Sequence, residues 1–201
     1  ADNNTAVGRS ALLNNTTGAQ NTAVGQAAGD ALTVGSYNVA LGQNALSSDT
    51  QGSQSVAIGS SALFTQNFTS ATAANNTAVG HGAGAAVTTG IYNTFIGGIC
   101  GDSAQTVSYS TLVGANMSTG DTSSNNCNGL GYGINAVSGY TTVGIGINDI
   151  RAAHGTATWA AVSDQRYKKD IVDSTAGLSF INALQPRTFK YKTLGELPET
   201  F

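Results

Sequence analysis

The fold is decided by the stretch NTAVGQAAGDALTVGSY at residues 21–37, whose pattern returns seventeen residues later as NVALGQNALSSDTQGSQ at residues 38–54. The pentad that opens each stretch ends in a glycine, which recurs at Gly8, Gly25, Gly42, Gly59, Gly80, Gly97, Gly114, Gly131 and Gly144. The steps between these pentad glycines are 17, 17, 17, 21, 17, 17, 17 and 13 residues. A unit this short leaves no room for a helix, so the repeat predicts a parallel β-solenoid whose coils pair their backbones about 4.8 Å apart.

Each unit consists, on this pattern, of two short strands and two glycine turns. A valine, leucine or isoleucine precedes every pentad glycine, and T-x-G turns end at Gly18, Gly35, Gly52 and Gly90. We expect the corner glycines to supply the positive φ that tight turns need, while neighbouring Asn and Thr side chains bond the turn backbone. Eight or nine coils at this spacing make a rod about 40 Å long.

The short strand of each pentad is apolar on both faces. Side chains alternate along a strand, so the residue before the branched one points the opposite way. This second column reads Ala6, Ala23, Ala40, Ala57, Ala78, Phe95, Leu112, Gly129 and Thr142. A single roll has one interior, so the other face is expected to pack on neighbouring chains of a homo-oligomer. The growth from alanine to Phe95 and Leu112 predicts that this packing changes toward the C-terminal coils.

Composition divides the chain near residue 150. The eight Lys and Arg and eleven Asp and Glu make nineteen charged residues, of which residues 1–150 hold seven and no lysine. Only three of the 26 glycines lie after residue 150. We therefore predict a repeat shaft or head over residues 1–150, a connector with a cleavage site over 151–162, and a separate segment over 163–201.

Three segments of the repeat resemble known fibres: QSVAIGSSAL (54–63), NTAVGQAAG (21–29) and NVALGQNAL (38–46). They are similar to the coils of YadA-like heads in trimeric autotransporter adhesins and to NTAVG-type repeats of phage tail fibres. The adhesin heads are left-handed parallel β-rolls that associate as trimers, so the resemblance implies a homotrimeric β-roll over residues 3–147. This unit is longer than the usual adhesin coil, which leaves a different cross-section or an intertwined triple β-helix open.

A second resemblance lies after the repeat, in SDQRYKKDI (163–171) and LQPRTFKYK (184–192), with an apolar spacing between them. These segments resemble the opening of the intramolecular chaperone domain at the ends of phage tailspikes, tail fibres and endosialidases. That family trimerises, guides folding of the preceding β-rich stalk and then cuts itself off with a serine and lysine dyad. Carried over onto this sequence, the resemblance implies Ser163 as nucleophile, Lys168 as base and cleavage between Val162 and Ser163.

The residues suit that chemistry. A serine hydroxyl is a poor nucleophile near neutral pH, and a neutral lysine amine takes its proton if desolvation or a neighbouring cation lowers the lysine pKa. Arg166 and Lys169 are candidate cations. The event is a single-turnover autoproteolysis, so no turnover enzyme is expected. The family domain normally extends further past its serine than Phe201, so residues 163–201 are expected to be its incomplete N-terminal part, and the start at Ala1 reads as a fragment or processed product.

The two cysteines are predicted to be free thiols. Cys100 takes a position where other coils have alanine, and Cys127 takes an Asn or Ser position of a pentad. They lie two coils apart, which is about 10 Å along the axis and exceeds the roughly 7 Å limit between the α-carbons of a disulfide. His81 and His154 have no second ligand at metal spacing, so surface positions are expected. We expect no metal and no cofactor.

The 21-residue step contains the insertion LFTQNFTSATAANN at residues 63–76. It adds Phe64 and Phe68 where other coils have a short turn. Extra residues on one coil of a solenoid form a side loop, and such loops often bind. Phe64 and Phe68 are therefore the candidate receptor-contact residues, and the alternative is a loop that seals a neighbouring subunit.

These features predict a structural, host-attaching module of a phage tail fibre or tailspike, made in the host cytoplasm and located extracellularly in the virion. The expected partners are its own copies, other tail proteins and a host surface receptor or glycan. The net charge of −3 provides no basic face for nucleic acid, and no apolar run is long enough for membrane insertion. A bacterial trimeric surface adhesin and the non-catalytic part of a polysaccharide depolymerase tailspike remain alternatives.

Overall fold

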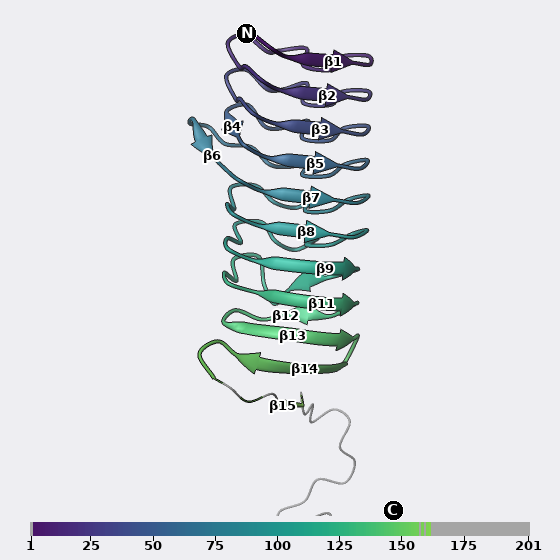
Figure 1. The fold of residues 1–201 in the computed structure, drawn as a ribbon, viewed down its shortest axis with the longest axis vertical. Coiled ribbons are helices and arrows are strands. Elements are labelled where there is room, and N and C mark those ends of the chain that lie inside the picture. Colours follow the sequence, from purple (N-terminus) through teal and green to yellow (C-terminus); the bar gives the residue numbers. More distant parts are fainter. Residues whose placement is uncertain (1, 157, 159, 162–201) are drawn as a thin grey trace, which may run out of the picture. The chain divides into compact units, whose positions relative to one another are not determined.

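The computed structural model describes residues 2–156, 158 and 160–161, which form a β-solenoid (Figure 1). Its main sheet has eleven strands, ordered as β1-β2-β3-β5-β7-β8-β9-β11-β13-β14-β15. Their bounds are β1 (Thr5–Val7), β2 (Thr22–Val24), β3 (Val39–Leu41), β5 (Val56–Ile58), β7 (Thr77–Val79), β8 (Thr94–Ile96), β9 (Thr111–Ala115), β11 (Asn128–Tyr132), β13 (Tyr140–Ile145), β14 (Asn148–Ala153) and β15 (Ala160–Ala161). Two small parallel pairs complete the set, β4 (Gly52–Ser53) with β6 (Thr72–Ala73) and β10 (Ser118–Thr119) with β12 (Asn135–Ala136).

The register of the main sheet follows the repeat. Each pentad strand from β1 to β13 pairs in parallel with the next, and equivalent pentad residues are partners, as in Ala6 with Ala23 and Val7 with Val24. The four extra residues of the 21-residue step do not disturb this register, since Val56 still pairs with Thr77 and Ile58 with Val79. The predicted all-β parallel solenoid is confirmed. No helix in the part of the chain that the structure describes could cross a membrane.

The two faces of the pentad strands have different environments. The residues in the middle of each strand, from Ala23 to Thr142, point into the coil and are buried; they form the inner column. The branched residues before the pentad glycines point outward and are exposed or half-exposed. This outer column consists of Val7, Val24, Leu41, Ile58, Val79, Ile96, Val113, Leu130 and Val143. The expectation that Phe95 and Leu112 alter the packing between chains is wrong, because both side chains fill the interior of their own chain.

Glycines make room for the large ring of Phe95. A Cβ added at Gly84 or at Gly101 would lie 2.9 Å from a Phe95 ring atom, which is closer than real contacts allow. Four residues after the pentad glycine, where Gly84 and Gly101 lie, other coils have leucines such as Leu46 that are fully buried. A large residue at one of these two positions of a coil is therefore matched by a small residue at the other, and the core stays close-packed.

The expectation of positive φ holds for the pentad glycines and is wrong for the glycines of the T-x-G turns. Gly18, Gly35, Gly52 and Gly90 do not have positive φ; a Cβ at Gly18 or Gly35 would clash with the carbonyl oxygen of the glycine in the next coil. The pentad glycines do have positive φ, from 127° at Gly8 to 158° at Gly144, and positive φ also occurs at three corner positions per coil that accept other residues. Asn3, Ser10 and Leu12, with φ of 61°, 63° and 51°, show these positions in the first coil. Coil-to-coil hydrogen bonds hold those corners, so a glycine is not required there.

A buried ladder of asparagines connects successive coils. The Asn21 N–H donates to Asn4 Oδ1 at 2.8 Å, and the Asn38 N–H donates to Asn21 Oδ1 at 2.9 Å. Each side-chain amide also donates to the carbonyl oxygen fourteen residues on, as Asn38 Nδ2 does to Gly52 at 2.9 Å. The expected side-chain bonding of the turn backbone is thus present, and it is buried. Such fully satisfied polar groups fix the alignment of the coils.

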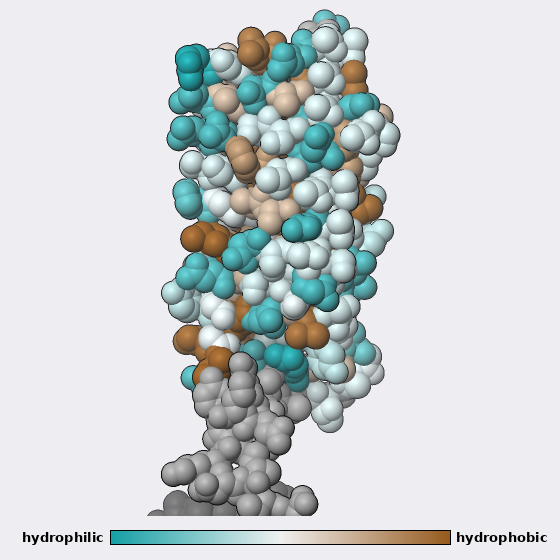
Figure 2. Space-filling model, turned by 180° about the vertical axis from the view of Figure 1, so that it is seen from behind, coloured by the Kyte–Doolittle hydropathy of each residue, from teal (hydrophilic) through white to brown (hydrophobic). Residues whose placement is uncertain are grey.

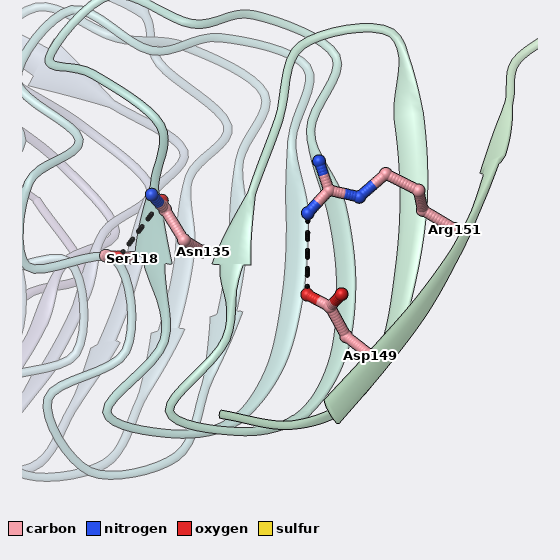
Figure 3. A network of polar contacts seen from close by, with 4 residues as sticks. All are labelled: Ser118, Asn135, Asp149 and Arg151. Carbon is pink, nitrogen blue, oxygen red and sulfur yellow. Dashed lines mark hydrogen bonds and ion pairs between the residues drawn. The ribbon is translucent and has the colours of Figure 1, made fainter. Parts of the chain in front are cut away.

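The coil direction reverses at the C-terminal end of the solenoid. β14 runs antiparallel to β13, and β15 runs antiparallel to β14, so the sheet continues past residue 150 in a new arrangement. The interior becomes polar here: Arg151 and Asp149 of β14 form an ion pair with 3.5 Å between Nη2 and Oδ2 (Figure 3). In the same view, Ser118 Oγ of β10 donates to Asn135 Oδ1 of β12 at 3.2 Å. Charged groups thus close the apolar core, as solenoid ends require.

Candidate functional site

The outer column forms an apolar stripe along the main sheet. The residues two before its members on the same strands are threonines and valines from β1 to β9 and Asn128 on β11, so these outward positions carry no charge from β1 to β11. Over β9, β11 and β13 the stripe includes a shallow hollow lined by Thr111, Val113, Asn128, Gly129, Leu130, Thr141 and Val143. The opposite face (Figure 2) is mostly hydrophilic to neutral, with hydrophobic side chains in separate spots. The chemistry of the stripe suits packing against another apolar surface and offers no group for catalysis.

The insertion separates its two phenylalanines. Phe64 is 39% exposed, whereas Phe68 is 6% exposed and packs inside the chain. The Phe68 side chain is therefore not available to a partner, and of the two candidate contact residues only Phe64 presents a surface. The longest exposed run of the insertion is Thr69, Ser70 and Ala71, which precede β6. In Figure 1 this segment projects sideways from the coils beside β4.

A buried polar cluster fixes the base of the insertion. Asp49 Oδ2 accepts a hydrogen bond from Gln66 Nε2 at 2.6 Å, and Asp49 Oδ1 accepts from the backbone N–H of Gly52 at 2.9 Å and of Phe68 at 3.2 Å. Gln66 Oε1 in turn accepts from Asn76 Nδ2 at 2.8 Å. The carboxylate of Asp49 is thus fully used in holding the loop, so it is a structural group.

The cysteines lie as the spacing predicts. Cys100 and Cys127 are free and buried, and Cys100 is a core residue. Burial raises the pKa of the Cys100 thiol from 9.0 to about 12, and burial also raises the pKa of Cys127. A thiol with a raised pKa is a poor nucleophile and a poor metal ligand. Neither cysteine is a candidate reactive group.

The histidines lie apart from one another. His81 is exposed, and His154 Nε2 lies 3.3 Å from both Asn128 Nδ2 and Thr141 Oγ1. Within residues 2–156, 158 and 160–161, no group of three His, Cys, Asp or Glu side chains could hold a metal ion.

The candidate catalytic residues Ser163 and Lys168, and Val162 at the cleavage site, lie outside the described residues. They remain predictions from the sequence. Sequence reasoning also passed over three exposed tyrosines, Tyr37, Tyr92 and Tyr109. Their signal was a shared place in the repeat, five residues before a pentad glycine.

Comparison with known proteins finds one family. Residues 163–200 match the family described as the chaperone of endosialidase, and the match begins at Ser163. No curated protein and no solved structure gives a significant match to the chain. The chain therefore joins a parallel β-solenoid to a C-terminal chaperone segment, which indicates a phage tailspike or tail fibre with an intramolecular chaperone.

Proposed function

We propose that this chain is a structural module of a phage tail fibre or tailspike that attaches the virion to its host. Three copies assemble along the outer column, directed by the chaperone segment, which then cuts itself off between Val162 and Ser163. The observation that carries the proposal is that a solenoid with seventeen-residue coils is followed directly by a match to the chaperone family that begins at Ser163.

The outer column supports self-association. It presents branched aliphatic side chains along the whole length of the sheet, and a contiguous exposed apolar patch of this kind marks an interaction site. A partner that carries the same repeat would present a matching stripe at the same spacing. Symmetric homo-oligomers bury such surfaces against copies of themselves.

Coil register gives the chaperone a task. Pentads such as NTAVG at residues 21–25 and 76–80 are identical, so chains that align out of step by whole coils would lose little pairing energy. A chaperone that trimerises at one end fixes the alignment before the coils pair.

The cleavage step balances as an acyl transfer to water. Ser163 Oγ attacks the carbonyl carbon of Val162 while Lys168 takes the hydroxyl proton, and the peptide C–N bond breaks as its nitrogen is protonated. Water then hydrolyses the ester, which leaves a carboxylate on Val162 and restores the Ser163 hydroxyl.

Mass spectrometry of the full-length product tests the cleavage. We expect a species that ends at Val162, absent in Ser163→Ala and in Lys168→Met, and present in the matched controls Ser174→Ala and Lys192→Met. An uncleaved wild-type chain, or a species ending at Val162 that persists in Ser163→Ala, would contradict autocleavage.

Light scattering tests the assembly. We expect the wild type to have three times the chain mass. The double variant Leu41→Glu/Ile96→Glu places charges in the outer column and should not assemble, whereas Gln26→Glu/Gln43→Glu adds the same charge at other exposed positions and should remain trimeric. A monomeric wild type, or a trimer unaffected by the outer-column charges, would contradict this mode of assembly.

A further inference from the structure

One corner of every coil holds its residue in the left-handed backbone region. This corner column comprises the residues five before each pentad glycine: Asn3 (φ 61°), Gln20 (59°), Tyr37 (61°), Gln54 (63°), Asn75 (51°), Tyr92 (57°), Tyr109 (58°), Asn126 (56°) and Gly139 (75°). Asparagine and glycine are the residues that this region favours, and a bulky side chain there is an outlier. The three tyrosines therefore need a reason other than the backbone.

Burial does not provide that reason. Tyr37, Tyr92 and Tyr109 are 58%, 50% and 55% exposed, so their rings contribute little to the core. The corner conformation is set by the backbone, since the Tyr37 N–H donates to the Ala19 carbonyl at 3.0 Å and the Tyr92 N–H donates to the Ala74 carbonyl at 2.8 Å. An unfavoured residue held in place by its surroundings is a reason to look for a function.

Two of the tyrosines stack on each other, so each ring keeps only its outer face free for a ligand. The rings of Tyr92 and Tyr109 have centroids 5.5 Å apart and planes that differ by 9°. Their mutual stacking offsets part of the cost of the corner conformation. Tyr37 lies between Gln20 and Gln54 in the column, so stacking on a column neighbour does not explain it.

The corner segments themselves carry no charged side chain. The corner segments TGAQ (17–20), VGSY (34–37), QGSQ (51–54), TAAN (72–75), TGIY (89–92), TVSY (106–109) and SSNN (123–126) contain no Asp, Glu, Lys, Arg or His. The exposed residues 69–71 of the insertion lead through β6 to Asn75 of this corner, and the insertion projects beside β4 (Figure 1). Aromatic faces, amides and hydroxyls are thus repeated along the axis, and next to the last segment the exposed Asp121 carboxylate accepts from the Ser123 N–H at 2.8 Å.

We propose that the corner column from Tyr37 to Asn126, together with residues 69–71, binds an uncharged glycan. The tyrosine faces stack on the apolar faces of sugar rings, and the amides and hydroxyls of the corner exchange hydrogen bonds with sugar hydroxyls. Tyrosine provides rigid contact area at a low entropic cost, and Asn and Ser provide adaptable hydrogen bonds. A nucleic acid or a sulfated polymer requires basic groups that this corner lacks. The proposal rests on the proposed role in host attachment and names its ligand class.

Each tyrosine has a replacement that the column itself supplies. Tyr37→Gln copies its neighbours Gln20 and Gln54, and Tyr92→Asn/Tyr109→Asn copies Asn75 and Asn126, so the corner conformation remains available. Tyr132→Asn is the matched control, because Tyr132 is 54% exposed but lies on β11 outside the column.

The test measures binding of the 201-residue chain to an array of uncharged glucans, mannans and galactans, with dextran sulfate as the anionic probe. We expect at least one uncharged glycan to bind, at least tenfold weaker binding in the triple tyrosine variant, and unchanged binding in Tyr132→Asn. Failure of every uncharged glycan to bind, binding of dextran sulfate alone, or wild-type binding by the triple variant would each overturn the proposal.

Thermal unfolding separates binding from folding. If the triple variant loses stability along with binding, the single variant Tyr37→Gln decides, because the Tyr37 ring has no stacking partner in the column. At least threefold weaker glycan binding at an unchanged midpoint of thermal unfolding supports the site. Unchanged glycan binding overturns it. The fibre proposal is tested independently by the mass and light-scattering experiments. A chain that trimerises and cleaves but binds no uncharged glycan leaves the fibre in place and removes this site alone.

Discussion

Two coils of the same solenoid fill the same cross-section in different ways. In the coil of Gly42 the interior holds Ala40, Ala45 and Leu46, whereas in the coil of Gly97 the same three positions hold Phe95, Cys100 and Gly101. The backbone pairing is unchanged between them, since both coils keep the parallel pentad register. The backbone and asparagine hydrogen bonds therefore set the shape of the coil, and large and small core residues can exchange positions as long as the total side-chain volume is kept.

The largest effect is expected from Phe95→Ala. This change gives the coil of Gly97 the small residue of Ala40 without the compensating leucine, so it leaves a cavity between Gly84 and Gly101. We expect a loss of about 3–5 kcal/mol in the free energy of unfolding, measured by urea denaturation. Phe64→Ala, which truncates a partly exposed ring, is the control and should cost far less. Equal losses would mean that Phe95 does not anchor the core.

The second prediction concerns the leucine that the coil of Gly42 has and the coil of Gly97 lacks. Gly101→Leu alone places a side chain against the Phe95 ring and should cost about 1–3 kcal/mol. Leu46 occupies the equivalent position with a φ of 52°, so the backbone accepts leucine there. Combined with Phe95→Ala, the substitution recreates the pairing of Ala40 with Leu46.

A double-mutant cycle measures that compensation. The double variant should be more stable than the sum of the two single losses by at least about 1 kcal/mol, because residues in contact couple. Simple additivity of the two losses would contradict the exchange of volume between the two positions.

The third prediction uses the thiol that the coil of Gly97 has and the coil of Gly42 lacks. Burial raises the Cys100 pKa from 9.0 to about 12, so the protonated thiol is favoured in the folded state. Its stabilising effect is complete below pH 9 and is lost as the pH rises from 9 toward 12, because the unfolded chain releases the proton first.

Unfolding experiments across this pH window check the sign. Stability should fall by about 1.4 kcal/mol for each pH unit well above 9, and Cys100→Ala, which copies Ala45, should reduce that slope. An identical slope in the wild type and the variant would refute a contribution from Cys100.

The smallest effect is expected from the asparagine ladder, which the two coils share. Asn38→Ser and Asn93→Ser each remove one hydrogen bond donated by the side-chain amide, to the Gly52 carbonyl at 2.9 Å and to the Val107 carbonyl at 2.6 Å. Both changes keep a side-chain acceptor for the backbone N–H of the next coil. Ser110 already acts in this way, since its Oγ accepts from the Cys127 N–H at 2.9 Å. We expect similar losses of about 1 kcal/mol from both changes in thermal unfolding. Clearly unequal losses would show that the ladder depends on how the core is filled.

The seventeen-residue period was sufficient to predict the parallel solenoid, because a repeat that short has few other ways to pair its backbone. Which face of the pentad lies inside could not be decided from the sequence, since Ala40 and Leu41 are both apolar. The volume exchange between Phe95 and Gly101 shows only when coils are compared in three dimensions.

The corner conformations were harder to predict. Local preference assigns positive φ to glycine, yet Leu12 and Tyr37 adopt it because hydrogen bonds from neighbouring coils outweigh that preference. The reversal at β14 also left no periodic signal, because the repeat ends there. Of the candidate site residues, Phe64 and Phe68 looked alike in the sequence, and their difference depends on the backbone bond from the Phe68 N–H to buried Asp49.

The reversed strand at the end of the solenoid also limits how molecules can stack. A free edge of a parallel solenoid is a template on which the first coil of another molecule could continue the same sheet. β14 runs against the pentad strands, and β15 pairs with Ile150 and Arg151 on its outer side, so the edge of β14 that an incoming β1 would have to join is reversed and already partly occupied. The antiparallel turn thus acts as a stop against end-to-end polymerisation, and it keeps a protein built from nearly identical coils at a defined length.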